Sequence, residues 1–164
     1  MENSVKVNLK EIDPREILGP IAHIYRSNVA YMAKELDAYR IGNGQFEFLL
    51  FLYCKDGVSQ ETIARTLKVS KATSARAIQN LEKEGYVHRE RDESDLRAYK
   101  VYLTEKGKEM RDIIFKKQTS FISILFSDFT FEEIEIVRLL LHKTVIKLFK
   151  PGFELPLDRP NDMK

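Results

Sequence analysis

The sequence predicts a mainly α-helical protein with one small β-hairpin. Several stretches place apolar residues at steps of three and four, which is the spacing of amphipathic helices. After Gly85 the pattern changes to β-branched and aromatic residues in rough alternation, which favours strands. Of the 164 residues, 43% are hydrophobic and 32% charged. This composition is globular, and the chain is long enough to bury its own core.

The first predicted helix begins at Asp13, which can cap it, and at Pro14, which suits the first helical position. Glu16 completes a box-like start. Apolar residues then recur at helical spacing over about two dozen positions: Leu18, Ile21, Tyr25, Val29, Met32 and Leu36, widened by Ile17, Ile24 and Tyr31. A helix that is apolar on more than one stripe needs more than one partner surface.

Two glycine-containing turns bracket a second predicted helix over roughly residues 44–55. Gly42 and Gly44 interrupt the helical pattern before it, and Asp56-Gly57 ends it. The apolar residues of this helix are Phe46, Leu49, Leu50, Leu52 and Tyr53.

The next two helices are short and predict a helix-turn-helix. Ser59 is placed to cap the first of them, and Ser70 to cap the second, which runs to about Glu84. Gly85 stands where the second helix requires a left-handed C-terminal residue. A connection of a few residues joins the two helices, as in a helix-turn-helix.

Segments 86–91 and 99–103 are predicted strands, and 92–98 is a polar hairpin tip. A hairpin directly after a helix-turn-helix is the outline of a winged helix. Two more helices are predicted, capped by Thr104 and Thr130, and Pro151-Gly152 ends the second. The predicted division is an N-terminal helix of a dimerisation region (1–42), a winged helix-turn-helix domain (43–103), C-terminal dimerisation helices (104–150) and an extended tail (151–164).

The helix that starts at Ser70 has two contrasting faces. Small and apolar residues share one face and suit packing against the preceding helix: Ser74, Ala77, Ile78 and Leu81. On the other face Arg76 and Gln79 are suited to reading base edges, while Ser70, Lys71 and Thr73 can reach phosphates. A solvated amphipathic helix is the alternative, and the hairpin that follows favours DNA binding over it.

Charge supports this interpretation. Residues 65–76 carry four basic side chains and no acidic one, although the whole chain has a net charge of only +2. Arginines near the hairpin tip, among them Arg91 and Arg97, suit a narrow minor groove. Asp95 is expected to hold Arg97 or to brace the hairpin. A winged-helix module that binds proteins and never touches DNA is the alternative function.

Residues 45–111 resemble the MarR family of transcriptional regulators. The similarity is most specific in LEKEGYVHRERDESDLRA followed by LTEKG, where Asp95-Leu96-Arg97-Ala98 matches the wing pattern D-x-R-A. The resemblance implies a homodimeric winged-helix regulator whose terminal helices interlock and whose two recognition helices enter successive major grooves of a pseudo-palindromic operator. It further implies a repressor that a small aromatic ligand releases from DNA.

Four residues are candidates to line a cleft for such a ligand: Tyr25, Tyr31, Met32 and Tyr39. Packing in a core or an interface is the alternative for aromatic residues at helical spacing. Cys54 is predicted to be a plain buried cysteine rather than a redox sensor, because it follows apolar residues and has one basic neighbour.

No cofactor, metal site or enzymatic activity is predicted. His23, His88 and His142 lie on separate elements without the spacing of metal ligands. The sequence contains no P-loop, G-x-S-x-G or H-E-x-x-H motif. Without a long apolar run or a leader-like N-terminus, the expected location is the cytoplasm.

Overall fold

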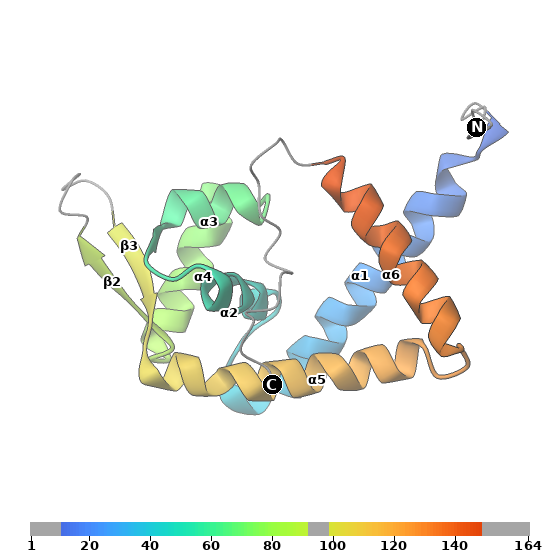
Figure 1. Cartoon of the computed structure of the whole chain (residues 1–164). Coiled ribbons are helices and arrows are strands. Elements are labelled where there is room, and N and C mark those ends of the chain that lie inside the picture. Colours follow the sequence, from blue (N-terminus) through green and yellow to red (C-terminus); the bar gives the residue numbers. More distant parts are fainter. Residues whose placement is uncertain (1–10, 92–98, 149–164) are drawn as a thin grey trace.

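The computed structural model describes residues 11–91 and 99–148, which fold into a mainly helical molecule with a small antiparallel sheet (Figure 1). The elements in chain order are α1 (Pro14–Leu36), a 3-10 turn η2 (Asp37–Tyr39), α2 (Gln45–Cys54), β1 (Val58–Ser59), α3 (Gln60–Thr66), α4 (Lys71–Lys83), β2 (Val87–Arg91), β3 (Tyr99–Leu103), α5 (Glu105–Leu125) and α6 (Phe131–Ile146). The predicted fold class is therefore confirmed.

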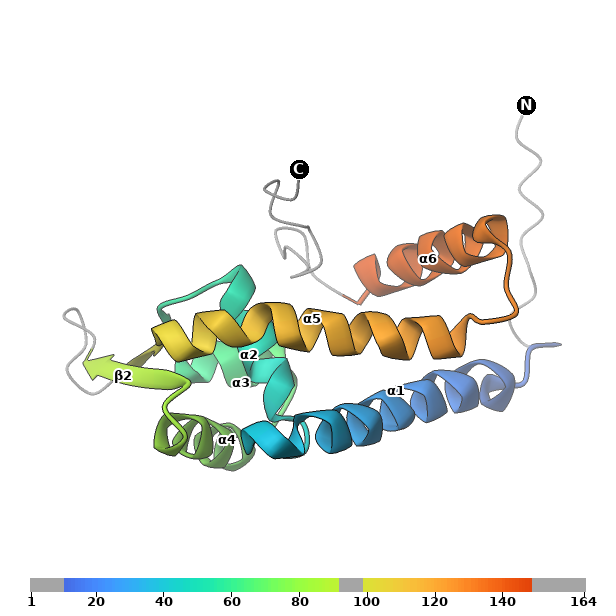
Figure 2. The same ribbon diagram turned by 90° about the horizontal axis from the view of Figure 1, so that it is seen from below.

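The molecule has two ends that α1 and α5 connect. Helices α2, α3 and α4 and the sheet form a winged body at one end (Figure 1). Helix α5 starts in this body and runs to the other end, with α1 packed beside it, and α6 folds back from the far end of α5 (Figure 2). None of the described helices is both long and apolar enough to cross a membrane.

Side-chain caps begin the helices at the positions that the sequence predicts. The side-chain oxygens of Asp13, Ser59, Ser70, Thr104 and Thr130 each accept a backbone N–H of the first helical turn. At Thr130 the full capping box is present. At Asp13 the predicted box is replaced, because the carboxylate binds the backbone and the guanidinium of Arg15. These local signals fix where each helix starts.

The sheet contains a strand that the sequence pattern does not predict. The order is β1-β3-β2, and the two residues of β1 pair antiparallel with β3, with Val58 opposite Val101. A strand of two residues is too short to show alternation, so only its partner reveals it. Strands β2 and β3 form the predicted hairpin, with Val87 opposite Leu103.

Helix α6 ends earlier than predicted. The α-helix stops at Ile146, before Pro151-Gly152. The N–H groups of Lys147 and Leu148 donate to the carbonyls of Thr144 and Val145, three residues back. Such bonds tighten the last turn and end the α-helical ladder, which a hydrophobic pattern cannot reveal.

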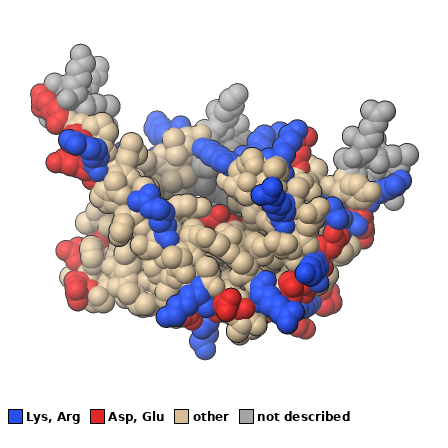
Figure 3. Space-filling view, turned by 180° about the vertical axis from the view of Figure 1, so that it is seen from behind, with Lys and Arg blue, Asp and Glu red and all other residues tan. Residues whose placement is uncertain are grey.

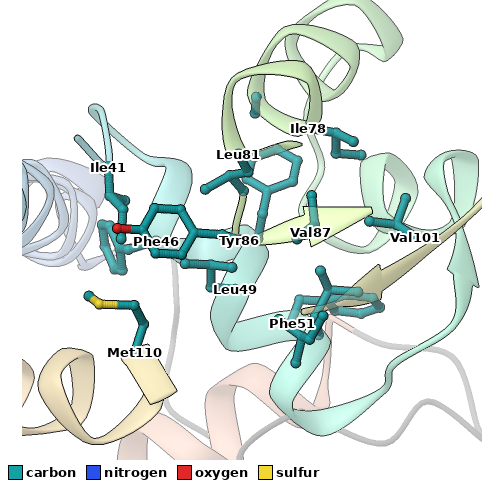
Figure 4. Close-up of a cluster of buried hydrophobic side chains, with 14 of the residues drawn as sticks. Ile41, Phe46, Leu49, Phe51, Ile78, Leu81, Tyr86, Val87, Val101 and Met110 are labelled. Carbon is teal, nitrogen blue, oxygen red and sulfur yellow. The ribbon is translucent and has the colours of Figure 1, made fainter. Parts of the chain in front are cut away.

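The core lies where α1, α2, α4, the sheet and α5 meet in the winged body (Figure 4). Helix α1 contributes Met32 and Leu36 from its C-terminal end, and α5 contributes Met110 and Ile114 from its N-terminal half. Helix α6 contains no buried residue. The core therefore holds the winged body together, whereas the other end presents apolar surface.

Gly107→Ala is expected to destabilise the fold, although alanine favours helices over glycine by about 1 kcal/mol. A Cβ at Gly107 would overlap the backbone carbonyl oxygen of Tyr86, and backbone cannot rotate away. Overpacking of this kind costs about 1–3 kcal/mol. Thermal unfolding of the variant measures this loss of stability. Gly19→Ala is the control, since no atom lies within 4 Å of its Cβ, and an unchanged melting temperature for Gly107→Ala would contradict the expectation.

Candidate nucleic-acid interface

Helix α4 packs on the winged body through the face that the sequence predicts. Ser74, Ala77, Ile78 and Leu81 are all buried. The Ser74 hydroxyl donates to the Gln60 carbonyl of α3 at 3.5 Å, which joins the two helices of the helix-turn-helix. Lys68, in the connection between them, has a φ of 54° and thus adopts the left-handed conformation that makes this turn tight.

The opposite face of α4 is open to solvent. All five predicted contact residues on this helix are exposed: Ser70, Lys71, Thr73, Arg76 and Gln79. The Ser70 oxygen accepts the Thr73 N–H at 3.0 Å, and the two hydroxyls lie 2.8 Å apart. The helix thus presents its N-terminus, where N–H groups and the positive end of the dipole favour an anion such as phosphate.

Basic side chains gather on this part of the surface. In Figure 3 several blue side chains stand near the upper edge of the molecule, where red ones also occur, and the lower edge mixes both signs. Arg65, Lys68, Lys71 and Arg76 of this region are all exposed. The arrangement fits the predicted basic stripe and forms a surface suited to polyanions.

One acidic residue that the sequence analysis did not single out lies within this surface. The Glu61 carboxylate of α3 pairs with the Lys71 ammonium at 2.8 Å, and both side chains are largely exposed. The pKa of Glu61 is lowered, first by its hydrogen bond to Lys71. No local pattern reveals this pair, because the partners belong to two helices that only the fold brings together.

A second ion pair fixes the C-terminal part of α4 to the wing. The Glu82 carboxylate accepts from Arg89 of β2 at 2.6 and 2.9 Å, and both side chains are about one-third exposed. The Arg89 guanidinium also lies 5.8 Å from the ring centre of Tyr99 on β3. Arg89 therefore braces the wing against α4. Arg91, at the end of β2, is exposed to solvent. Asp95 and Arg97 lie outside the described residues.

The four predicted ligand-cleft residues have different surroundings. Tyr25 donates to the Glu47 carboxylate at 3.3 Å, and burial raises the pKa of Glu47. The Tyr31 ring packs against Phe121 of α5, with 5.3 Å between ring centres. Met32 lies fully in the core, which is the alternative that the sequence left open, and Tyr39 is exposed in η2.

Cys54 is exposed, and the prediction of a buried cysteine is wrong. It is the last residue of α2, where the chain leaves the core, so its apolar neighbours in sequence do not cover it. Partial desolvation raises its pKa, with an opposing effect of Arg111, and this disfavours the reactive thiolate. Within 11–91 and 99–148, no group of three His, Cys, Asp or Glu residues is arranged to hold a metal ion.

Comparisons with known proteins agree with this geometry. The model of the MarR family matches residues 41–99. The uncharacterized HTH-type transcriptional regulator YybA of Bacillus subtilis (strain 168) is 35% identical over 133 residues, which cover 78% of this chain and 85% of that protein.

Solved structures extend the similarity to the helices that flank the winged body. A MarR transcriptional regulator from Methanosarcina mazei Go1 is 42% identical, with a TM-score of 0.74, covering 82% of this chain and 99% of that one. A MarR family regulator from Listeria monocytogenes, crystallised with a 26mer DNA, is 26% identical, with a TM-score of 0.73, covering 80% of this chain and 88% of that one. From its sequence and its fold alike, this chain belongs to the MarR family of transcriptional regulators, and it is not an enzyme.

Proposed function

We propose that the chain is a sequence-specific double-stranded DNA-binding regulator that represses transcription as a homodimer in the cytoplasm. The observation that carries the proposal is the two-faced helix α4, which buries the face that runs from Ser74 to Leu81 and exposes Lys71, Arg76 and Gln79. The similar Listeria protein in complex with DNA supports it.

Each contact residue has a role that follows from its position. Ser70, Lys71 and Thr73 lie in the first turn of α4, where they and the helix N-terminus bind phosphates. Arg76 and Gln79 follow on the exposed face and read base edges in the major groove. On the wing, Arg91 faces the minor groove, and Asp95 and Arg97 take the roles predicted from the sequence pattern.

The terminal helices supply the dimer interface. Large apolar side chains are exposed along these helices: on α1 Ile17, Leu18, Ile21 and Ile24; on α5 and the turn after it Phe115, Ile122, Ile124 and Phe129; on α6 and after it Phe131, Ile136, Leu139, Leu140, Leu141, Ile146 and Leu148. A second copy of the chain would cover these side chains, because large apolar patches on a protein surface mark interaction sites. Two copies also match the two-fold symmetry of a pseudo-palindromic operator.

Repression and its relief by a small aromatic ligand follow from the family resemblance. The ligand would bind near Tyr25, Tyr31, Met32 and Tyr39, where α1 meets α2 and α5. A ligand releases DNA only if it binds the DNA-free conformation more tightly than the DNA-bound one.

Selection from a library of randomised duplexes tests the DNA-binding function. The purified chain is expected to enrich one sequence with two-fold symmetry, and to bind it at least about a thousandfold more tightly than random duplex at physiological salt. Failure to enrich any sequence, together with capture of a specific protein, would instead support the protein-binding alternative.

Substitutions at the pair Glu61–Lys71 are expected to act in opposite directions. Lys71→Ala removes a phosphate contact, so it weakens binding to all duplexes alike and reduces the slope of log affinity against log salt by about 1. Glu61→Gln removes the carboxylate that holds Lys71 and repels DNA, so it strengthens binding to all duplexes about two- to threefold. Titrations across salt concentrations measure both, and weaker binding by Glu61→Gln would show that the acid positions Lys71.

A further inference from the structure

The C-terminal end of α4 meets the segment after α1 and the start of α5 at one residue, Tyr86. Its backbone N–H donates to the Leu81 carbonyl of α4 at 2.8 Å, so the residue is part of the helix end. Its ring is 2% exposed and lies in the core near Phe46 and Leu49 (Figure 4).

The Tyr86 hydroxyl reaches the short segment that follows α1. It donates to the backbone carbonyl of Tyr39, the last residue of η2, at 2.7 Å. In Figure 4 its oxygen, drawn in red, points toward Ile41. At the surface of the same junction, the Arg40 guanidinium lies 3.8 Å from the Glu84 carboxylate. Two polar links thus join the end of α4 to the segment that continues α1.

The start of α5 holds the same helix end from another side. The Thr104 N–H donates to the Tyr86 carbonyl at 3.1 Å, and the Thr104 hydroxyl donates to the Gly85 carbonyl at 2.6 Å. The Lys106 ammonium donates to the Glu84 carbonyl at 2.6 Å and lies 4.2 Å from the ring centre of Tyr86. A cation at this place is favoured by the negative end of the α4 dipole.

This junction lies between the two surfaces that a dimer must align. Helices α1 and α5 carry exposed apolar side chains, and α4 carries the predicted DNA contacts. A change of one base pair in half-site spacing moves the second half-site by about 3.4 Å and turns it by about 35°. A dimer follows such a change only if α4 rotates relative to α1 and α5, and this rotation strains the bonds at Tyr86.

We propose that Tyr86 is a positioning residue whose hydroxyl bond to Tyr39 fixes the orientation of α4 relative to the dimerisation helices, and that it thereby determines which half-site spacing the dimer accepts. The inference rests on the proposed function, because it assumes a dimer that binds two half-sites.

The test compares Tyr86→Phe with the wild type on the duplex that the wild type selects from a randomised library, and on versions of it with the spacing changed by one and two base pairs. The measured quantity is the ratio of affinities for the selected and the altered spacing. Loss of one hydrogen bond is expected to lower this ratio about three- to tenfold. A folded Tyr86→Phe variant with the wild-type ratio would overturn the proposal.

Tyr53→Phe is the matched control. The Tyr53 hydroxyl also donates to a backbone carbonyl, that of Gly107 at 2.9 Å, but it joins α2 to α5 and not α4 to α1. Its loss is expected to lower the melting temperature and leave the spacing ratio unchanged. An equal drop of the ratio in both variants would mean that Tyr86 acts through general stability, and would overturn the proposal.

Arg40→Gln keeps the test decisive if Tyr86→Phe does not fold, because Arg40 is exposed and lies outside the core. The Arg40 side chain crosses the same junction, so this substitution is expected to lower the ratio of affinities for the selected and the altered spacing by a smaller factor. If Tyr86→Phe does not fold, an unchanged ratio for Arg40→Gln overturns the proposal. If the wild type selects no duplex, the proposed function fails and the inference fails with it. If the wild type selects one and neither variant changes the ratio, the inference alone fails.

Discussion

Arg76→Ala is expected to lower the affinity of the dimer for its operator by about 1–3 kcal/mol, which is about five- to 150-fold. Arg76 is exposed on α4, and within the described residues no carboxylate pairs with its guanidinium. By contrast, Lys71 is paired with Glu61, and Arg89 with Glu82. The guanidinium of Arg76 is therefore available to bind a guanine edge through two hydrogen bonds.

The measurement is a pair of titrations, with the operator and with random duplex of the same length. Arg76→Ala is expected to lose most of the difference between the two, whereas Lys71→Ala, the control, weakens both by the same factor. An equal loss on both duplexes for Arg76→Ala would make Arg76 a phosphate contact and would leave base reading without its main residue.

Leu141→Glu is expected to raise the dissociation constant of the dimer by at least about a hundredfold. Leu141 is 49% exposed on α6, a helix without any buried residue. Burial of one leucine side chain contributes about 1.5–3 kcal/mol, and in a symmetric dimer each substitution counts twice. A carboxylate in the same place adds a desolvation cost.

The variant is expected to remain folded in the winged body, because the buried core draws on α1 to α5 and not on α6. Sedimentation measures the dimer, and circular dichroism measures the helices. Lys83→Glu is the control for the added charge, since Lys83 is exposed on α4 in the winged body and not on α6. A Leu141→Glu chain that sediments as a stable dimer would contradict the proposed interface.

Features set by neighbours in sequence could be predicted from the sequence, and features set by distant partners could not. The caps at Ser59, Ser70 and Thr130 depend on residues three positions away, and all three were predicted. Gly85 was expected in the left-handed conformation and has a φ of 76°. The inward face of α4 was also predicted, since a helix places residues at fixed intervals on one side.

The features that the sequence did not reveal join segments far apart in the chain. Strand β1 exists only through its pairing with β3, more than forty residues later. The bond from Tyr86 to Tyr39 spans 47 residues. The exposure of Cys54 depends on where α2 ends relative to the core and not on its apolar neighbours. Spacing patterns describe one element at a time, so contacts between elements lie beyond them.

We propose that α4 of each protomer reads the major groove of one of two half-sites. Methylation interference on the selected operator tests this most directly, because methylation of guanine N7 blocks the major groove at one base while methylation of adenine N3 blocks the minor groove. The interfering guanines are expected to fall into two blocks whose centres lie about one helical turn apart, and Arg76→Ala is expected to remove this interference. Interference at adenines of the minor groove alone, or at one uninterrupted block, would contradict it.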